Sequence, residues 1–305
     1  MANILVVGSL NTDLVVRTPR FPQPGETISG EDLQVIPGGK GANQAVASSR
    51  LGANVSMLGR VGKDNFGDFL LDNLKSNNVD SQLVQRDDAS TGTAIIIVDA
   101  NGQNSIVLSP GANGKVSSSD VEHASFSDFS LLLLQLEIPT PTVLSATKLA
   151  KQNGVRVILN PAPAKELPDE LIALVDFIIP NETELSLLTG MEVKDSSSAE
   201  KAAKKLIGLG AQNAIVTLGS KGALIVNKDT STHVEPYQVD VVDTTAAGDA
   251  FIGGLASALD SASSLADAVR YGCACGAIAT TKFGAQPSLP TKEDVENLVG
   301  AQRND

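Results

Sequence analysis

The sequence predicts one α/β domain built on a mostly parallel sheet, and three observations support this fold class. Beyond about residue 130, short apolar runs alternate with helical stretches, which is typical of strands buried on both faces of a parallel sheet. The chain also opens with such a run, "NILVVGS" at 3–9, which Gly8 ends. Finally, 305 residues with 42% hydrophobic content suffice for one large core, and no repeat or long linker divides the chain.

The first third of the chain contains β-rich pieces that do not fit this alternation. After the opening strand, further strands are expected at 11–16, 27–35 and 54–62. The segment 93–108 predicts two strands around Asn101-Gly102, a dipeptide that favours a hairpin turn. The pieces at roughly 12–37 and 90–111 could form a small separate sheet, a candidate lid, or could be edge strands of the main sheet.

The remaining elements follow from apolar runs and helical composition. A short-linked strand in "KGALIVN" (221–227) is expected to be antiparallel. The other later strands are expected at 130–137, 155–160, 175–180 and 213–219, and the helices at 40–52, 64–78, 141–154, 198–210, 249–259, 263–281 and 291–301.

Composition excludes some classes of protein. The net charge of −12 argues against a sequence-independent nucleic-acid binder, which needs a basic surface to neutralise phosphates. The aromatic content of 3%, with no Trp, also makes stacking platforms for single strands unlikely to form, so no nucleic-acid partner is expected. The N-terminal apolar run spans about five residues, which is too short for a signal peptide or a membrane span, so no membrane partner is expected.

The two cysteines, Cys273 and Cys275, lie two apart in "YGCACGAIA". Residues with this spacing do not share a helix face, so we interpret them as small apolar helix residues rather than metal ligands. Nothing suggests a disulfide framework, which favours a reducing, cytoplasmic location.

Polar residues follow several of the expected strands. Because ligands of open α/β sheets bind beyond the carboxyl ends of the strands, these residues predict a pocket for a polar ligand at that rim. They are Asn11, Asp13, Glu137, Asn160, Asn181, Thr217 and Gly219. Asn11 and Asp13 point the same way in an extended segment, so together they could hold hydroxyl groups. The alternative for this pair is a helix cap or an Asx-turn.

Two glycine-containing segments precede expected helices. In "PGGKGANQA" (37–45), glycines allow the backbone to approach a ligand, although such turns are common and no P-loop occurs in the chain. In "DTTAAGDAFIGG" (243–254), the amides of Ala246, Ala247 and Gly248 can converge at a helix N-terminus as an anion cradle. Asp249 beside this cradle is either an ordinary first-turn cap or a base for phosphoryl transfer.

Taken together, these segments resemble the two signatures of the ribokinase-like (PfkB) sugar kinases. "NETE" (181–184) and "TLGSKG" (217–222) are similar to the family's Mg-phosphate and nucleotide motifs, and "GSLNTDL" and "KFGAQPS" also fit. The ordered match runs from about residue 4 to 290. Within the family, "GGKGANQA", "NPAPA" and "GAQPS" are most similar to the ribose-specific members rather than to fructokinases or adenosine kinases.

The resemblance implies a three-layer α/β/α fold with a small β-sheet lid, and ATP-dependent phosphorylation of D-ribose to ribose 5-phosphate. Asp249 would be the base for the 5-hydroxyl, and the amides of Ala246, Ala247 and Gly248 would form the anion hole. The resemblance also implies a lid at 12–37 and 90–111 that pairs across a homodimer and closes over ribose, which would exclude water. The residues implied to hold ribose are Asn11, Asp13, Gly39, Lys40, Asn43, Glu137 and Asp249.

The resemblance further implies a nucleotide site and two cations. Mg²⁺ would enter with ATP and contact Glu184 through water, and K⁺ would activate the enzyme. One position departs from close relatives, because Cys273 stands where His is expected in some members, which leaves the adenine contacts open. The residues implied to face the nucleotide are Asn181, Thr217, Gly219, Ser220, Gly222, Gly248 and Cys273. Those implied for K⁺, mostly through carbonyls, are Asp243, Thr245, Ala279, Lys282, Gly284 and Ser288.

Three alternatives remain at this point. The nearest is another sugar or nucleoside kinase of the same family, above all a deoxyribose kinase. A second is a catalytically inactive sugar-binding regulator, against which the intact Asp249 and "AAG" argue. A third is a structural module without a ligand, which would leave the polar residues at the rim unexplained.

Overall fold

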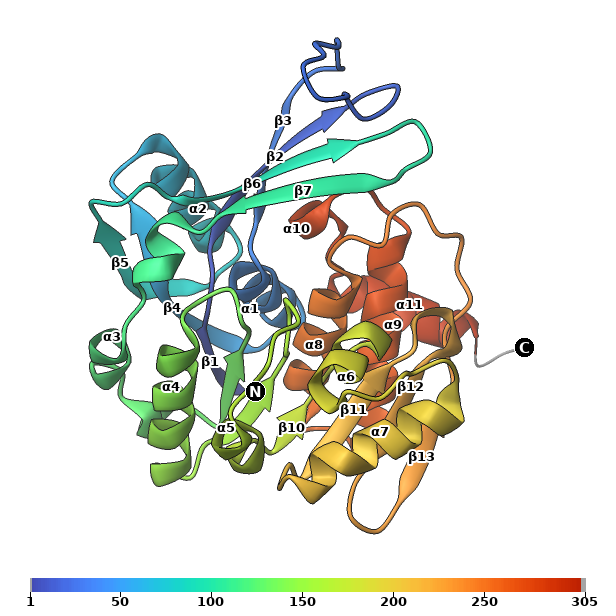
Figure 1. Cartoon of the computed structure of the whole chain (residues 1–305). Coiled ribbons are helices and arrows are strands. Elements are labelled where there is room, and N and C mark those ends of the chain that lie inside the picture. Colours follow the sequence, from blue (N-terminus) through green and yellow to red (C-terminus); the bar gives the residue numbers. More distant parts are fainter. Residues whose placement is uncertain (1, 303–305) are drawn as a thin grey trace.

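The computed structural model describes residues 2–302 and contains two sheets (Figure 1). The larger sheet has nine strands in the order β13-β12-β11-β10-β9-β8-β1-β4-β5. All neighbouring pairs are parallel except those of β12, which runs antiparallel to β11 and β13. The strands are β1 (Asn3–Val7), β4 (Asn54–Gly62), β5 (Asp80–Asp87), β8 (Leu131–Leu134), β9 (Arg156–Leu159), β10 (Phe177–Ile178), β11 (Asn213–Thr217), β12 (Ala223–Val226) and β13 (Ser231–Val234).

The central strands are apolar on both faces, and this creates two cores. In β1, Ile4 and Val6 belong to one hydrophobic cluster, whereas Leu5 and Val7 belong to the other, because successive side chains of a strand point to opposite faces. The strand β8, which consists of four leucines, divides in the same way. The sheet is therefore the middle layer of a three-layer α/β/α arrangement, as the resemblance implied.

The helices fall into two groups that cover the two faces. The first cluster contains residues of α1 (Lys40–Arg50), α2 (Asn65–Ser76), α8 (Ala247–Ala258), α9 (Leu265–Thr280) and α11 (Lys292–Ala301). The second contains residues of α3 (Ser118–Glu122), α4 (Thr140–Gln152), α5 (Asp169–Leu174), α6 (Glu182–Thr189) and α7 (Ser196–Gly208).

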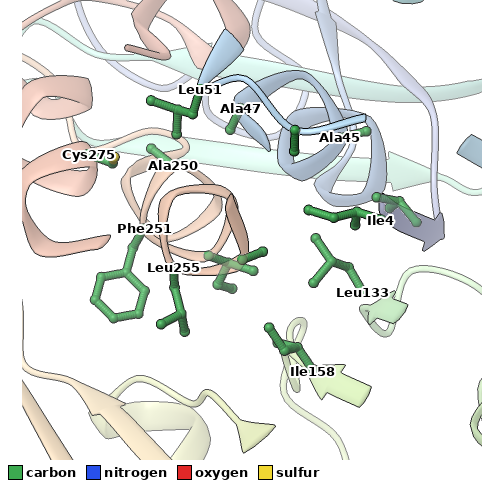
Figure 2. Packing of buried hydrophobic residues seen from close by; sticks show 14 of the residues in the cluster. Ile4, Ala45, Ala47, Leu51, Leu133, Ile158, Ala250, Phe251, Leu255 and Cys275 are labelled. Carbon is green, nitrogen blue, oxygen red and sulfur yellow. The ribbon is translucent and has the colours of Figure 1, made fainter. Parts of the chain in front are cut away.

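Small residues allow α1 and α8 to pack closely. A Cβ atom added to Gly253 of α8 would lie only 2.5 Å from the Cβ of Ala47 of α1, so glycine is required for this approach. Figure 2 shows Ala45 and Ala47 of α1 and Ala250, Phe251 and Leu255 of α8 in the cluster that also receives Ile4, Leu133 and Ile158 from the sheet. This contact brings the two glycine-containing segments, 37–45 and 243–254, to the same place.

The smaller sheet consists of β2 (Asn11–Arg17), β3 (Gln34–Gly38), β6 (Gly92–Val98) and β7 (Asn104–Ser109), in the order β3-β2-β6-β7. It rises from one end of the body, above the short helix α10 (Ala285–Ser288) (Figure 1). Its central pair, β2 and β6, is parallel, and β3 and β7 add antiparallel edges. The pieces that broke the alternation thus form a separate sheet and are not edge strands of the main one.

Several elements differ from the sequence-based expectations. The polar edge strands β5 and β13 were not predicted, because their exposed, charged or hydroxylated residues lack the apolar pattern of a buried strand. No strand forms at 27–33, and β3 begins only at Gln34. The helix α8 begins at Ala247 rather than at 249, so Asp249 lies within its first turn.

Candidate functional site

The Asp249 carboxylate lies at the centre of the site, held by two side chains of α1. Asp249 is 6% exposed, and its Oδ2 accepts a hydrogen bond from Asn43 Nδ2 at 2.9 Å. Its Oδ1 accepts one from Gln44 Nε2 at 3.0 Å. Adjacent residues 43 and 44 reach the same carboxylate because the start of α1 faces the start of α8 across the small-residue contact.

The backbone before Asp249 adopts an unusual conformation. Ala246 has a φ of 58°, in the left-handed region that costs a non-glycine residue about 1 kcal/mol. This conformation caps α8: Ala250 N–H donates to Ala246 O at 2.8 Å, and Ala247 N–H lies 3.3 Å from Thr244 O. Gly248 is exposed. The amides of 246–248 therefore lie at the positive end of the helix dipole, beside the carboxylate.

A second group of residues surrounds the start of α1. The backbone N–H of Lys40 donates to Glu137 Oε2 at 3.0 Å, and the Ser9 hydroxyl donates to the same oxygen. Gly39 has a φ of 88°, and a Cβ atom there would lie 2.7 Å from the amide nitrogen of Asn11, so this turn requires glycine. These hydrogen bonds consequently join three segments: the loop after β1, the loop before α1 and the segment that follows β8.

On the small sheet, Asn11 and Asp13 take different partners. Asn11 Oδ1 accepts a hydrogen bond from Asn113 Nδ2 at 2.7 Å, and the same Asn113 side chain bridges the backbone N–H and C=O groups of Leu10. The Asp13 carboxylate lies against the Cα of Gly38, where a Cβ atom would come within 2.2 Å of Oδ2. The hydrogen bond from Asn113 thus orients the Asn11 side chain, whereas the protonation of Asp13 depends on the neighbouring charges.

Acidic side chains outnumber basic ones around Asp13 and Lys40. Burial raises the pKa of Asp13, and the negative charges of Glu137 and Asp249 raise it further, to about 7, although Lys40 opposes this. Burial disfavours the charged form of Lys40, but the carboxylates of Asp249, Glu137, Glu184 and Asp13 outweigh it and raise the pKa of that ammonium. The partly buried ammonium of Lys40 is therefore the cation that interacts with all four of these carboxyl groups.

Most of the residues expected to face a nucleotide, though not Gly248 and Cys273, lie at or just after the ends of β10 and β11. Asn181 caps α6 in a reciprocal pair: Glu184 N–H donates to Asn181 Oδ1, and Asn181 N–H donates to Glu184 Oε2, both at 2.8 Å. Burial raises the pKa of Glu184 despite this hydrogen bond and the nearby Lys40. Asn181 also forms an isolated parallel β-bridge with Thr217. This bridge joins the segment after β10 to the end of β11.

The turn after β11 contains the rest of this group. Gly219 and Gly222 have φ angles of 56° and 84°, and a Cβ atom at Gly222 would lie 2.1 Å from Val234 O. Gly219 and Ser220 are exposed, so their backbone is accessible to a ligand. Cys273 lies on α9, which packs against β12 and β13, and is 9% exposed in the hydrophobic core. Burial raises the pKa of its thiol to about 12.

Asp243 organises the loop that precedes α8. Its Oδ1 accepts hydrogen bonds from the N–H (2.9 Å) and hydroxyl (2.7 Å) of Thr245, and its Oδ2 accepts one from Gly284 N–H at 2.9 Å. Burial opposes the charged form, but these donors together lower the pKa of Asp243, so it is ionised. Of the other residues expected around a cation here, Ala279 and Ser288 are buried and Lys282 is exposed.

A cavity of about 150 Å³ lies between the small sheet and this loop. The small sheet contributes one face, which includes Asp13, Val15 and Arg17, and the body contributes Asp243 and Phe283. The Arg17 guanidinium lies 4.3 Å from the centre of the Phe283 ring, a cation–π contact that joins the sheet to the body.

The structure thus brings together most of the residues singled out in the sequence. Asn43, Lys40, Glu137 and Asp249 meet at one rim, whereas Cys273 is largely enclosed in the core. Sequence reasoning missed Ser9, Asn113, Gln44 and Gln135. Gln44 stands beside Asn43 at the start of α1, but nothing local indicated what it contacts.

Two searches of residues 2–302 bear on other kinds of site. No group of three or more His, Cys, Asp or Glu side chains in this range could hold a metal ion. Within the same range, no helix is long and apolar enough to cross a membrane.

Comparisons with known proteins agree with the geometry. A family model described as "pfkB family carbohydrate kinase" matches residues 1–292. The chain is 44% identical to a ribokinase of Haemophilus influenzae over 294 residues, 95% of this chain and 96% of that one. It is 40% identical to a deoxyribokinase of Salmonella typhi over 301 residues, 97% and 98% of the two chains. The structure of Arabidopsis thaliana ribokinase complexed with ribose and ATP has a TM-score of 0.91, at 34% identity over 98% of each chain.

The raised pKa of Asp13 leads to a prediction about stability. Between its ordinary pKa of 3.8 and about 7, Asp13 retains a proton in the folded state but loses it in the unfolded state. The free energy of unfolding should therefore fall by about 1.4 kcal/mol per pH unit through this window because of this one group. Asp13→Asn, which cannot titrate, should lack this contribution.

Urea denaturation at intervals from pH 4 to pH 7 would measure both proteins. The wild-type value minus the Asp13→Asn value should decrease as the pH rises. A difference that stays constant across this range would contradict the prediction.

Proposed function

This chain belongs to the pfkB family of carbohydrate kinases, and on that premise we propose that it phosphorylates D-ribose at the 5-hydroxyl with ATP, releasing ribose 5-phosphate and ADP. The observation that carries the proposal is the position of Asp249. It is a buried carboxylate next to the amides of a helix N-terminus, hydrogen-bonded to Asn43, on the same rim as Lys40 and Glu137.

The chemistry follows from these neighbours. Asp249 accepts the proton of the 5-hydroxyl while that oxygen forms a bond to the γ-phosphorus, and the bond from this phosphorus to the bridging oxygen breaks as ADP leaves. The amides of Ala246, Ala247 and Gly248 stabilise the negative charge on the transferring group. The preorganised backbone at Ala246 supports this role, because a strained turn holds the donors in place before the substrate arrives.

Ribose recognition rests on the residues around α1 and β2. Amide and carboxylate groups together donate to and accept from hydroxyls, and a single buried ammonium can donate three hydrogen bonds. In the proposed assignment the sugar contacts come from Asn11, Asp13, Gly39, Lys40, Asn43 and Glu137. The similarity to a deoxyribokinase keeps 2-deoxyribose as the second candidate substrate. The intact Asp249 argues against an inactive sugar-binding regulator.

The nucleotide is proposed to occupy the ends of β10 and β11. The exposed backbone of Gly219 and Ser220 and the joined residues Asn181 and Thr217 support this placement. Mg²⁺ fits here as an ion that arrives with ATP, because Glu184 offers a carboxylate and Mg²⁺ commonly uses one or two carboxylates plus phosphates and water. When bound, it would neutralise phosphate charge. Gly222 and Gly248 complete the proposed contacts, with Cys273 packing near the purine.

A monovalent cation, K⁺, is proposed to bind the loop at Asp243. The donor set fits such an ion, since it combines one ionised carboxylate with backbone carbonyls and lacks the several side-chain ligands that a transition metal needs. When bound, the cation would offset the charge of Asp243 near the anion hole. The proposed ligands are Asp243, Thr245, Ala279, Lys282, Gly284 and Ser288.

The small sheet is proposed to act as a lid over the sugar. Its inner face lines the 150 Å³ cavity, and its β2 strand carries Asn11 and Asp13. Closure would exclude water and thereby suppress ATP hydrolysis. We also propose a cytoplasmic location, which the two unbridged cysteines support.

Measurement of ADP release tests the proposed substrate. Purified protein with Mg-ATP should give the highest kcat/KM with ribose, compared with 2-deoxyribose, fructose and adenosine, and addition of K⁺ should raise the rate. A higher kcat/KM for 2-deoxyribose would assign the enzyme to the second candidate. Absence of turnover with every sugar would overturn the proposed function.

Replacing the proposed base separates binding from chemistry. Asp249→Ala should lower kcat by about 10²- to 10⁴-fold. Calorimetry should show that ribose binding changes by only a few-fold, because the other sugar contacts remain. Asp267→Ala is the matched control: it also removes a first-turn acid, from α9, but that side chain is exposed and pairs with Arg270. Wild-type turnover by Asp249→Ala would disprove the assignment of the base.

We further propose that the outer face of the small sheet pairs with a second copy of the chain. One cross-strand row on this face contains Leu14, Val35, Ile95 and Val107. Three of these are markedly exposed, at 44%, 49% and 63% for Val35, Ile95 and Val107. An exposed apolar sheet face of this kind is typical of a protein–protein contact.

Analytical ultracentrifugation would test this assembly. The wild type should sediment as a dimer, and the double variant Ile95→Glu/Val107→Glu should sediment as a monomer, because charges would be buried against an apolar surface. Leu187→Glu, on α6 and similarly exposed at 46%, should remain dimeric. A monomeric wild type, or a dimeric double variant, would contradict the proposal.

A further inference from the structure

A chain of three buried amide side chains ends on Asp249. Gln135 Nε2 donates to Gln44 Oε1 at 2.6 Å, and Gln44 Nε2 donates both to Asp249 Oδ1 at 3.0 Å and to Asn160 Oδ1 at 3.2 Å. Gln135 and Asn160 follow the ends of β8 and β9, and Gln44 lies in the first half of α1. Gln44 and Gln135 are fully buried, and Asn160 is 7% exposed, so these contacts are shielded from water.

We propose that Gln44 is a positioning residue that holds the Asp249 carboxylate in its reactive orientation, and that Gln135 acts through Gln44 by fixing which end of its amide faces Asp249. This inference rests on the proposed function, because it assigns the orientation of the base in that reaction.

The orientation of the amides follows from their two ends. An ionised carboxylate only accepts hydrogen bonds, so the Gln44 group that faces Asp249 must be its NH₂. The Gln44 oxygen then needs a donor, which Gln135 Nε2 supplies. Asn160 is oriented in the same way, because its Nδ2 donates to the carbonyl of Ile179 at 3.2 Å, and its oxygen is left to accept from Gln44. Every polar atom of Gln44 is thereby satisfied in one arrangement only.

At Gln135, the end of the amide series farthest from Asp249, this arrangement has a cost in stability. Gln135 Oε1 is buried and has no hydrogen-bond partner within residues 2–302. A buried acceptor without a partner typically costs about 1–3 kcal/mol, a cost that an apolar side chain would avoid. The side chain is also confined, because a Cβ atom on Gly8 would lie 2.1 Å from this oxygen. A purely space-filling role does not account for Gln135, whereas a donor aimed at Gln44 does.

Gln44 also differs from the other donor to the base. Asn43 is proposed to contact the sugar as well, because its Oδ1 has no hydrogen-bond partner within residues 2–302 and can accept from a hydroxyl while Nδ2 donates to Asp249. Gln44 lies behind the carboxylate and has no such second task. The charged groups around Asp249, namely Lys40, Asp13, Glu137 and Glu184, act through the electric field and do not fix its rotamer. A small displacement of a reacting group can lower a rate by about 10²-fold, so a dedicated support for the base has kinetic value.

The first test is Gln44→Met, which keeps the length of the side chain and removes its donors. The value of kcat with ribose should fall by about 10- to 100-fold, while KM for ribose stays within about threefold. Gln44→Glu is a second variant of nearly the same shape. Its deficit in kcat should grow as the pH rises, because the introduced carboxyl can donate only while protonated.

A double-mutant cycle tests the role of Gln135. Gln135→Met alone should lower kcat, but the double variant with Gln44→Met should be no slower than Gln44→Met alone. Multiplied effects would mean that Gln135 does not act through Gln44. Ser48→Ala is the matched control: Ser48 is buried one turn further along α1 and donates to the backbone carbonyl of Gln44 at 2.8 Å, away from Asp249. It should lower the melting temperature without changing kcat.

Two outcomes separate this inference from the proposed function. If the wild type phosphorylates ribose and Gln44→Met retains its kcat, the positioning role is overturned and the function stands. A crystal structure of Gln44→Met gives a readout that needs no turnover: the Asp249 carboxylate should leave its wild-type rotamer. If it does so in a protein whose wild type phosphorylates no sugar, the proposed function fails and the support of Asp249 by Gln44 stands. An unmoved Asp249 would contradict the inference directly.

Discussion

The site depends on the close contact between helices α1 and α8. Gly253 against Ala47 lets the two helices approach at a distance that any larger side chain would prevent. Because both helices begin at the same rim, their first turns bring together a lysine, two amides and a carboxylate from segments about 200 residues apart. No single one of these groups is unusual, and what makes them a site is the packing of the small residues beneath them.

Charge is the second constraint on this rim. Lys40 is surrounded by Asp13, Glu137, Glu184 and Asp249, so the pocket has an excess of acid before any ligand enters. Such a balance suits a ligand rich in hydroxyls on one side and a phosphate that arrives with its own cations on the other. Asp13 accommodates the excess by holding a proton more readily than an ordinary aspartate. The acidic groups therefore suit the hydroxyls of a ligand, whereas the N-terminus of α8 suits a phosphate group.

Much of this arrangement could be predicted from the sequence. The apolar runs at 130–137 and 155–160 specified buried parallel strands, and the Asn101-Gly102 pair marked the hairpin between β6 and β7. The strands β5 and β13 were missed because edge strands need no apolar pattern. The start of α8 was misplaced because Ala246 adopts a positive φ angle, which the sequence of a non-glycine residue does not indicate. Asp249 was singled out by its local setting. Gln44, Gln135 and Asn113 act only through partners that are distant in sequence, which no local pattern records.

The strand β2 belongs to the small sheet, yet it continues directly from β1 of the body and carries Asn11 and Asp13. In the proposed lid, the cover over the pocket and part of the sugar contact would therefore belong to the same piece of backbone. Closure of the sheet and contact with the sugar would then occur in a single movement. Substitutions along β2 would then alter the proposed sugar contacts and leave unchanged the start of α8, where phosphate is proposed to bind.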